Sequence, residues 1–377
     1  MRAFRSVAGV SAIVLAWASV AMAEVKYTVT DLGTLGGASS SAGCINNQGQ
    51  IVGSATTRSG ESHAFLYSGV TMVDLGTLGG SSSSASGIND NGQIVGTSTL
   101  ADNTRRAYLY QDGRMQSLGT LGGPESYGGS INNQGQIVGT SYCQSDPWNP
   151  IQHGFLYSNG VMNDLGAPAP YTHSAAGCIN NKGQITGTVD IEIKDWVQPA
   201  LYSGGTWSVL QVPYWGTGYA DDINDRGQVV VSERHVSPYP TPEAHVLLYT
   251  DGVPTDLGTV APGRNSYPAA INNVGQIVGY SYAQDEWSDS TRAFLYSDGS
   301  MTNLNTLIDP QAGWELTYAM DINDAGQIVG QGWITVDENG QSVRQSHAFL
   351  LTPIPEPLAG WMIPLVLAGL CRRRLGK

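Results

Sequence analysis

Tryptophans beside carboxylates are the residues of this 377-residue chain whose types and spacing best support ligand chemistry. Three segments between predicted strands carry such a group, and a further tryptophan precedes Asp337 and Glu338. Flat aromatic rings suit the apolar faces of sugars, and carboxylates accept hydrogen bonds from sugar hydroxyls. We therefore predict a surface that binds an extracellular glycan. Its candidate residues are Asp146, Trp148, Asp195, Trp196, Asp285, Glu286, Trp287 and Trp333.

Other roles for these residues stay open. Each tryptophan could instead fill the space beneath its own long loop. A second hypothesis is a hydrolase or lyase of polysaccharides, in which acids such as Asp146, Asp195 or Asp285 perform the chemistry. Glycosidases hold two carboxyl groups about 5 to 9.5 Å apart, so that separation would distinguish an enzyme from a binding protein. A third hypothesis is a structural matrix protein whose fold serves only as a spacer.

Motifs of the common catalytic centres are missing from the sequence. It has no Gly-x-Ser-x-Gly, no His-Glu-x-x-His, no phosphate loop ending in Gly-Lys-Ser or Gly-Lys-Thr, and no Cys-x-x-Cys. This absence weakens the enzyme hypothesis, and we expect a non-enzymatic protein without a cofactor. The acidic composition permits binding of divalent cations such as calcium.

Composition limits the class of protein. The chain has 18 Lys and Arg against 31 Asp and Glu, a formal net charge of −13, and only 13% charged residues. Its 48 glycines follow no Gly-X-Y period, which excludes collagen, and the low charge excludes disorder and long helical coils. So few basic residues disfavour a nucleic-acid partner. A turn-rich, all-β protein remains.

One phrase, Ile-Asn followed by a turn and Gly-Gln, recurs seven times. The intervals between copies are 43, 43, 48, 44, 48 and 51 residues. This period is typical of the four-stranded blade of a β-propeller. The seven repeats are numbered here by the isoleucine of the phrase, which is Ile45, Ile88, Ile131, Ile179, Ile223, Ile271 and Ile322.

Turn residues divide each repeat into four strands. The strand ending in Ile-Asn and the strand beginning Gln-Ile-Val-Gly meet at a short turn, where Gly49 of the first repeat can take the left-handed conformation. A third strand, His-Ala-Phe-Leu-Tyr, follows a variable loop. A tight turn such as Asp251-Gly252 then leads into a fourth strand ending in Asp-Leu-Gly. The variable loops, with the tryptophans, are expected on the face opposite the Ile-Asn turns.

Strand counting predicts how the ring closes. The seventh repeat stops at its third strand near Leu351, whereas an unmatched Asp-Leu-Gly strand, residues 27–33, precedes the first repeat. The N-terminal strand can complete the last blade and so remove exposed sheet edges. We predict an all-β fold of about 28 strands, a β-propeller of seven four-stranded blades whose ring is closed by the N-terminal strand. A six-bladed ring and an open array are the alternatives.

Residues that recur in every repeat are expected to be structural. The His63 position holds His, Arg or Gln, which suits a contact between strands or blades, and its seven-fold spacing is too wide for a metal site. Asn46, Gln50 and their counterparts are expected to build turns. Cys44 and Cys178 occupy equivalent positions three repeats apart, so we expect packed thiols rather than a disulfide.

Both ends of the chain have features of export signals. Residues 1–23 combine arginines, an apolar stretch and the small residues Ala21 and Ala23, which predicts a signal peptide cleaved after Ala23. Near the other end, Pro355, Glu356 and Pro357 precede a 13-residue apolar run and the basic cluster Arg372, Arg373 and Arg374. Such a short run is a poor permanent membrane span, so we expect only transient membrane contact. An ordinary C-terminal anchor is the alternative.

These phrases resemble known extracellular sequences. His-Ala-Phe-Leu-Tyr-Ser, Asp-Leu-Gly-Thr-Leu-Gly-Gly and Ile-Asn-Asn-x-Gly-Gln-Ile-Val-Gly are similar to the HAF repeat from about residue 27 to residue 352. The C-terminal tail resembles the PEP-CTERM sorting signal of Gram-negative bacteria that make exopolysaccharide. That resemblance implies processing by an exosortase, a membrane protease, and a place at the cell surface or in the biofilm matrix. The expected parts are a signal peptide (1–23), a HAF-repeat propeller (24–352) and a sorting tail (353–377).

Overall fold

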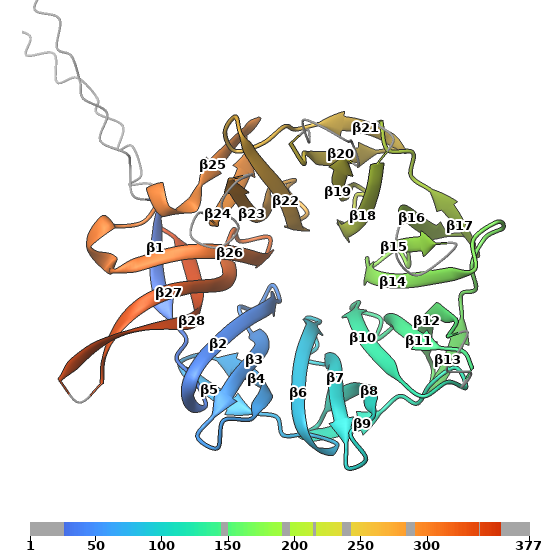
Figure 1. Ribbon diagram of the computed structural model, residues 1–377, viewed down its shortest axis with the longest axis horizontal. Helices are drawn as coiled ribbons and strands as arrows, with labels where there is room; N and C mark the ends of the chain where they lie inside the picture. Colours follow the sequence, from blue (N-terminus) through green and yellow to red (C-terminus); the bar gives the residue numbers. More distant parts are fainter. Residues whose placement is uncertain are drawn as a thin grey trace, which may run out of the picture.

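A computed structural model describes residues 26–144, 150–190, 197–213, 216–235, 243–283, 291–338 and 340–355. These residues form 28 strands and two short 3-10 helices, so the fold is all-β (Figure 1). Within the described ranges, no helix has the length and apolar character needed to cross a bilayer. The predicted signal peptide, with Ala21 and Ala23, lies outside them. So do Glu356, Pro357, Arg372, Arg373 and Arg374 of the predicted sorting motif, in which Pro355 is the last described residue.

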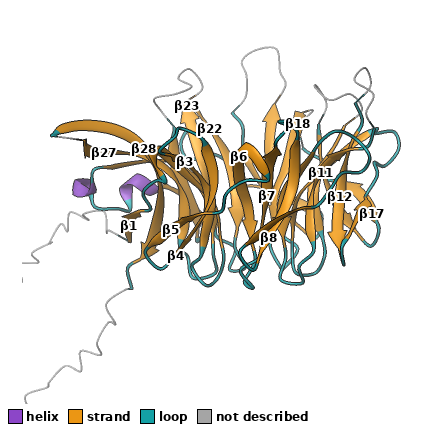
Figure 2. Ribbon diagram, turned by 90° about the horizontal axis from the view of Figure 1, so that it is seen from below, coloured by secondary structure: helices purple, strands orange, loops and turns teal. Residues whose placement is uncertain are grey.

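The strands form sheets arranged around a common centre (Figure 1). Five sheets have four strands each, hydrogen-bonded in chain order, so each repeat folds on its own neighbours in sequence. Seen from the side, the sheets stand next to one another in a single layer (Figure 2). The five sheets are β6 (Gly79–Ile88), β7 (Ile94–Leu100), β8 (Arg105–Gln111) and β9 (Arg114–Ser117); β10 (Ser126–Ile131), β11 (Ile137–Tyr142), β12 (Gln152–Ser158) and β13 (Val161–Asp164); β14 (His173–Ile179), β15 (Ile185–Asp190), β16 (Gln198–Ser203) and β17 (Thr206–Val209); β18 (Gly216–Ile223), β19 (Val229–His235), β20 (Val246–Thr250) and β21 (Val253–Asp256); and β22 (Arg264–Ile271), β23 (Ile277–Ala283), β24 (Arg292–Ser297) and β25 (Ser300–Asn303).

The first and last repeats share an eight-stranded sheet. Its N-terminal strand β1 pairs antiparallel with β28, from Tyr27 opposite Pro353 to Asp31 opposite Phe349. One parallel bridge, between Ser39 and Ser346, joins the two halves. Thus β1 lies where the last repeat lacks its own fourth strand. The strands are β1 (Tyr27–Asp31), β2 (Gly36–Ile45), β3 (Ile51–Thr57), β4 (Ser62–Ser68), β5 (Thr71–Asp74), β26 (Trp314–Ile322), β27 (Ile328–Glu338) and β28 (Gln341–Pro353).

A glycine and an aromatic residue occupy facing positions in most repeats. Gly53 of β3 pairs with the buried Phe65 of β4, and a Cβ added to Gly53 would lie 3.0 Å from the phenylalanine ring. The ring therefore fills the space above the glycine. In the fifth repeat, Val231 and Leu247 replace this pair, so the larger residue on one strand compensates for the smaller one on the other.

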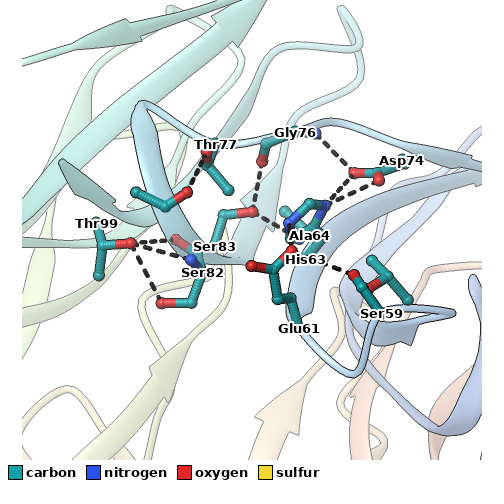
Figure 3. A network of polar contacts seen from close by, with 12 residues as sticks. Ser59, Glu61, His63, Ala64, Asp74, Gly76, Thr77, Ser82, Ser83 and Thr99 are labelled. Atoms are coloured by element: carbon teal, nitrogen blue, oxygen red, sulfur yellow. Dashed lines mark hydrogen bonds and ion pairs between the residues drawn. The ribbon is translucent and has the colours of Figure 1, made fainter. Parts of the chain in front are cut away.

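Repeated histidines pair with the aspartates of Asp-Leu-Gly. His63 Nδ1 lies 2.8 Å from Asp74, which also accepts a hydrogen bond from the Gly76 backbone N–H at 2.7 Å (Figure 3). The pairs join the third strand to the fourth, which confirms the prediction of a structural contact. The last of them joins β28 to β1. The other pairs are His153 with Asp164, His245 with Asp256, and His347 with Asp31.

Seven buried asparagines link successive repeats. Asn46 donates from Nδ2 to the backbone oxygen of Asn89 at 3.0 Å, and the later copies donate in the same way to the next repeat. The seventh, Asn323, donates to Asn46 at 3.1 Å. Each Oδ1 accepts two backbone N–H groups of its own turn, as Asn180 does from Lys182 and Gln184. The predicted role in turns is confirmed, and these bonds add a role between repeats.

Changing Asn180 to Asp is expected to destabilise the fold by about 3 kcal/mol or more. The carboxylate keeps the two acceptor contacts but loses both donors, and its charge would face the Gln184 Oε1 and Asn224 oxygens. Denaturant unfolding followed by circular dichroism measures the loss. The control is Asn159→Asp, because Asp112, Asp251 and Asp298 occupy equivalent turns with the same positive φ. Equal stability of the two variants would contradict this account.

Candidate functional site

A cavity of about 590 Å³ lies at the centre of the sheets. Ligand pockets usually enclose about 300 to 1,000 Å³, so this volume suits a small molecule or part of a polymer. The residues that carry its chemistry come mostly from the fifth, sixth and seventh repeats. They are Tyr219, Asp221 and Asp222 of β18, Tyr267 of β22, Tyr280 and Tyr282 of β23, and Asp321 of β26.

Tyrosines form an aromatic wall on one side of the cavity. Tyr267 stacks against both Tyr280 and Tyr282, with ring centroids 5.4 and 5.5 Å apart. Tyr280 also meets Tyr318 edge-on at 5.0 Å. Across the sheets, Tyr267 and Tyr280 are directly opposite residues of β22 and β23, which brings their rings together. Tyr219 is 49% exposed and adds an accessible ring to the cavity lining.

Two aspartates of the cavity also join neighbouring repeats. Asp321 Oδ2 accepts a hydrogen bond from the Ile45 N–H at 2.8 Å, and Asp222 Oδ2 accepts one from the Ile271 N–H at 2.8 Å. Asp221 Oδ2 instead accepts from the Ser232 N–H at 2.7 Å, within its own sheet. These bonds hold the carboxyl groups in fixed positions at the cavity wall.

Thiols also line the cavity. Cys44 and Cys178 occupy the position just before the isoleucine of the repeated phrase, as Asp222 and Asp321 do in other repeats. Both cysteines are free, which confirms the prediction of packed thiols. Cys178 Sγ lies 3.2 Å from the Asp221 backbone oxygen.

Burial shifts the protonation of these groups. It raises the pKa of Asp221 to about 8 and that of Asp222 to about 7, and it also raises the pKa of Asp321. The exposed part of each side chain faces the cavity, and the surrounding protein removes much of the water that would stabilise a charge. This desolvation raises the pKa by more than the backbone hydrogen bonds lower it. Burial raises the pKa of the Cys44 and Cys178 thiols as well. Near neutral pH the cavity therefore presents proton donors to a ligand.

Among the predicted binding residues, only Trp333 is described. It lies in β27, is 38% exposed, and has the Arg344 guanidinium 4.8 Å from its ring centre. It does not belong to the residues that line the cavity. Strand β23, which carries Tyr280 and Tyr282, ends directly before the segment that contains Asp285, Glu286 and Trp287. Outside the described residues lie Asp146, Trp148, Asp195, Trp196, Asp285, Glu286 and Trp287.

The cavity tyrosines and aspartates were not predicted as site residues. In the sequence they can be recognised because they differ from the residues at the equivalent positions of other repeats. Tyr280 stands where the first repeat has Ser54, and Asp222 stands where the second has Gly87. A comparison of repeats at the positions that face the centre would have found them.

Comparison with known proteins informs the fold and not the function. A family described as a protein of unknown function (DUF3466) matches residues 209–317, a stretch that holds β18 to β25. No curated protein sequence matches the chain.

Several solved structures are similar in fold. The β-propeller domain of the Trilobed protease from Pyrococcus furiosus has a TM-score of 0.52 at 11% identity, over 86% of this chain and 95% of that one. A puromycin-hydrolyzing peptidase from Mycobacterium tuberculosis has a TM-score of 0.53 at 11% identity, over 86% and 55%. An acylaminoacyl peptidase has 0.52 at 11% identity, over 87% and 52%. The chain spans about half the length of these two peptidases, and the likeness establishes a propeller-like fold alone.

Proposed function

We propose that this chain is an exported β-propeller that binds an extracellular polysaccharide without cleaving it. The observation that carries the proposal is the aromatic wall of Tyr267, Tyr280 and Tyr282 beside the carboxyl groups of the central cavity. Stacked rings offer flat apolar surfaces, and neutral carboxyl groups can both donate and accept hydrogen bonds. Sugars need both kinds of contact. The tryptophan segments 145–149, 191–196 and 284–290 are proposed to extend this binding surface.

The proposed architecture is a ring of seven four-stranded blades closed by β1. Its support is the set of contacts between the first and last repeats. Besides the β1 and β28 pairing, Asn323 donates to the Asn46 oxygen, Asp321 accepts from the Ile45 N–H, and the Ile354 N–H donates to the Lys26 oxygen at 2.8 Å. Each of these contacts links residues more than 270 positions apart in the sequence.

The proposed location is the cell surface or extracellular matrix of a Gram-negative bacterium. It rests on the resemblance of residues 353–377 to a PEP-CTERM signal and of the repeats to HAF sequences. In this proposal an exosortase processes the tail, and the chain contacts the membrane only through that tail.

One observation favours a second candidate function, a polysaccharide hydrolase or lyase. Perturbed carboxyl groups cluster at catalytic sites, and burial raises the pKa of Asp221 to about 8 and that of Asp222 to about 7. At neutral pH, Asp221 would be mostly protonated and Asp222 partly so, and a general acid must carry its proton. Incubation of any bound glycan with the protein, followed by chromatography of the products, distinguishes the two functions. Shortened chains that disappear in an Asp222→Asn variant would establish the enzyme.

Replacing Tyr219 with Ala is expected to weaken glycan binding about tenfold, which corresponds to about 1.4 kcal/mol. The ring is exposed, so its removal should leave the fold intact. Glycan arrays with and without calcium identify the ligand, and titration calorimetry then measures its affinity. Tyr219→Phe is the matched control, because it keeps the stacking ring.

A triple variant is expected to lose all retention on the same glycan. It combines Trp148→Ala, Trp196→Ala and Trp287→Ala. Unchanged retention in both this triple variant and Tyr219→Ala would contradict the proposed surface. If the wild-type protein binds no glycan on the array, the result would favour a scaffold protein.

A further inference from the structure

A cysteine, a histidine and an aspartate of the third repeat meet at one edge of their sheet. Cys143 directly follows β11, His153 lies near the start of β12, and Asp164 ends β13. Their potential ligand atoms all lie within 4.8 Å of one another. We propose that this group, the Cys-His-Asp cluster, binds a divalent transition-metal ion such as Zn²⁺.

The cysteine distinguishes this cluster from the structural pairs of other repeats. His63 and Asp74 of the first repeat have a 2.8 Å contact (Figure 3), and His153 and Asp164 of the third repeat have the same one. Counted from the residues that face these two histidines, Ala55 and Ser141, the first repeat has Thr57 where the third has Cys143. The third repeat therefore adds a thiol to a pair that elsewhere only joins two strands. The histidines of different repeats are too widely spaced to share a metal ion, whereas the residues of this cluster lie within one repeat.

Backbone pairing holds the three positions. The Cys143 N–H donates to the Ile151 oxygen at 2.9 Å, so this residue remains anchored beyond the end of its strand. His153 lies opposite Ser141 in the β11 and β12 pair, and Asp164 accepts from the Gly166 N–H at 2.7 Å. Zinc bonds of about 2.0 to 2.3 Å place neighbouring ligand atoms about 3.5 Å apart in a tetrahedron. The three ligand atoms lie within 4.8 Å of one another, so side-chain rotations that shift them by about an ångström would give that spacing.

The donor set selects the class of metal. Thiolate and imidazole are ligands that Zn²⁺ prefers, whereas Ca²⁺ and Mg²⁺ take oxygen ligands. The His153 side chain is 19% exposed and that of Asp164 is 45% exposed, so an ion can enter from solvent. Three protein ligands leave a fourth tetrahedral position for water.

Metal titration of the full-length protein, stripped beforehand with a chelator, tests the proposal. We expect one equivalent of Zn²⁺ by calorimetry, and a thiolate-to-cobalt absorption band when Co²⁺ replaces it. Cys143→Ser should lower the Zn²⁺ affinity at least tenfold and remove the cobalt band. His63→Asn is the matched control, since it breaks the equivalent pair of a repeat that lacks the thiol, and its affinity should stay within twofold of the wild type.

Two results would overturn the proposal. One is an absence of stoichiometric Zn²⁺ binding by the wild-type protein, and the other is an unchanged affinity in Cys143→Ser. Circular dichroism checks that the variant is folded. If it is not, Asp164→Asn provides the same test, because the amide keeps an acceptor for the Gly166 N–H but is a weaker metal ligand, and a loss of less than tenfold there would count against the cluster.

Discussion

Raising the pH from about 5 to about 8.5 is expected to lower the free energy of unfolding by several kcal/mol. Asp221 and Asp222 have pKa values of about 8 and about 7 in the folded protein, against 3.8 for an unperturbed aspartate. Between about pH 4 and pH 8, the folded chain therefore retains protons that the unfolded chain has released. Because the folded state binds more protons, its stability falls as the pH rises through this window. Below pH 4 both states are protonated, and the effect disappears.

The variant Asp221→Asn isolates this contribution from the titration of the other acidic residues. The amide oxygen can still accept the Ser232 N–H, but the side chain has no charge to bury. Urea unfolding of both proteins across the pH range should give similar stability near pH 4 and a more stable variant at pH 8.5. A constant difference at every pH would contradict the raised pKa.

Replacing Gly187 with Ala is expected to cost about 3 kcal/mol or more of stability. This glycine of β15 faces the bulge of β14, and a Cβ there would lie 1.8 Å from the Ala175 backbone oxygen. No side-chain rotation can relieve a clash with backbone, so the two strands would have to separate. Thermal unfolding followed by circular dichroism measures the effect.

Gly177→Ala is the control for this clash. Gly177 lies on the paired strand β14, is exposed, and has an ordinary contact of 3.7 Å from its added Cβ to the Thr186 oxygen. It is expected to change the stability by less than about 0.5 kcal/mol. Comparable losses in both variants would show that glycine flexibility, rather than close approach, explains the glycine that most repeats have at the position of Gly187.

The strand pattern was predictable because each repeat is a local unit. Turns such as Asp112-Gly113, with positive φ at both residues, delimit strands that pair with their neighbours in sequence. The unmatched strand at residues 27–33 predicted a partner in the last repeat, and β1 pairs with β28. Both inferences need only the spacing of turn residues and the requirement that backbone groups be paired.

The cavity was not predictable from the repeat pattern, because it depends on which repeats meet at the centre. Tyr267 and Tyr280 become neighbours through strand register, and Asp321 reaches Ile45 from the far end of the sequence. Nor does the pattern show that Asn46 donates to Asn89, since its turn role already accounts for the residue. Trp333 has a residue type common in sugar-binding sites, but it lies in the hairpin of β27 and β28 and not in the cavity lining.

The pairing of β1 with β28 also determines how the molecule would respond to mechanical force. Tyr27 at the start of β1 lies opposite Pro353 at the end of β28, so force applied between the two termini peels these strands apart one hydrogen bond at a time. Peeling requires less force than sliding strands past each other, because the bonds break in sequence. A load between the C-terminus and a ligand in the central cavity enters β28 at this same end, so it also peels β28 away from β1. The contact between β1 and β28 is therefore expected to open first when either end of the chain is pulled.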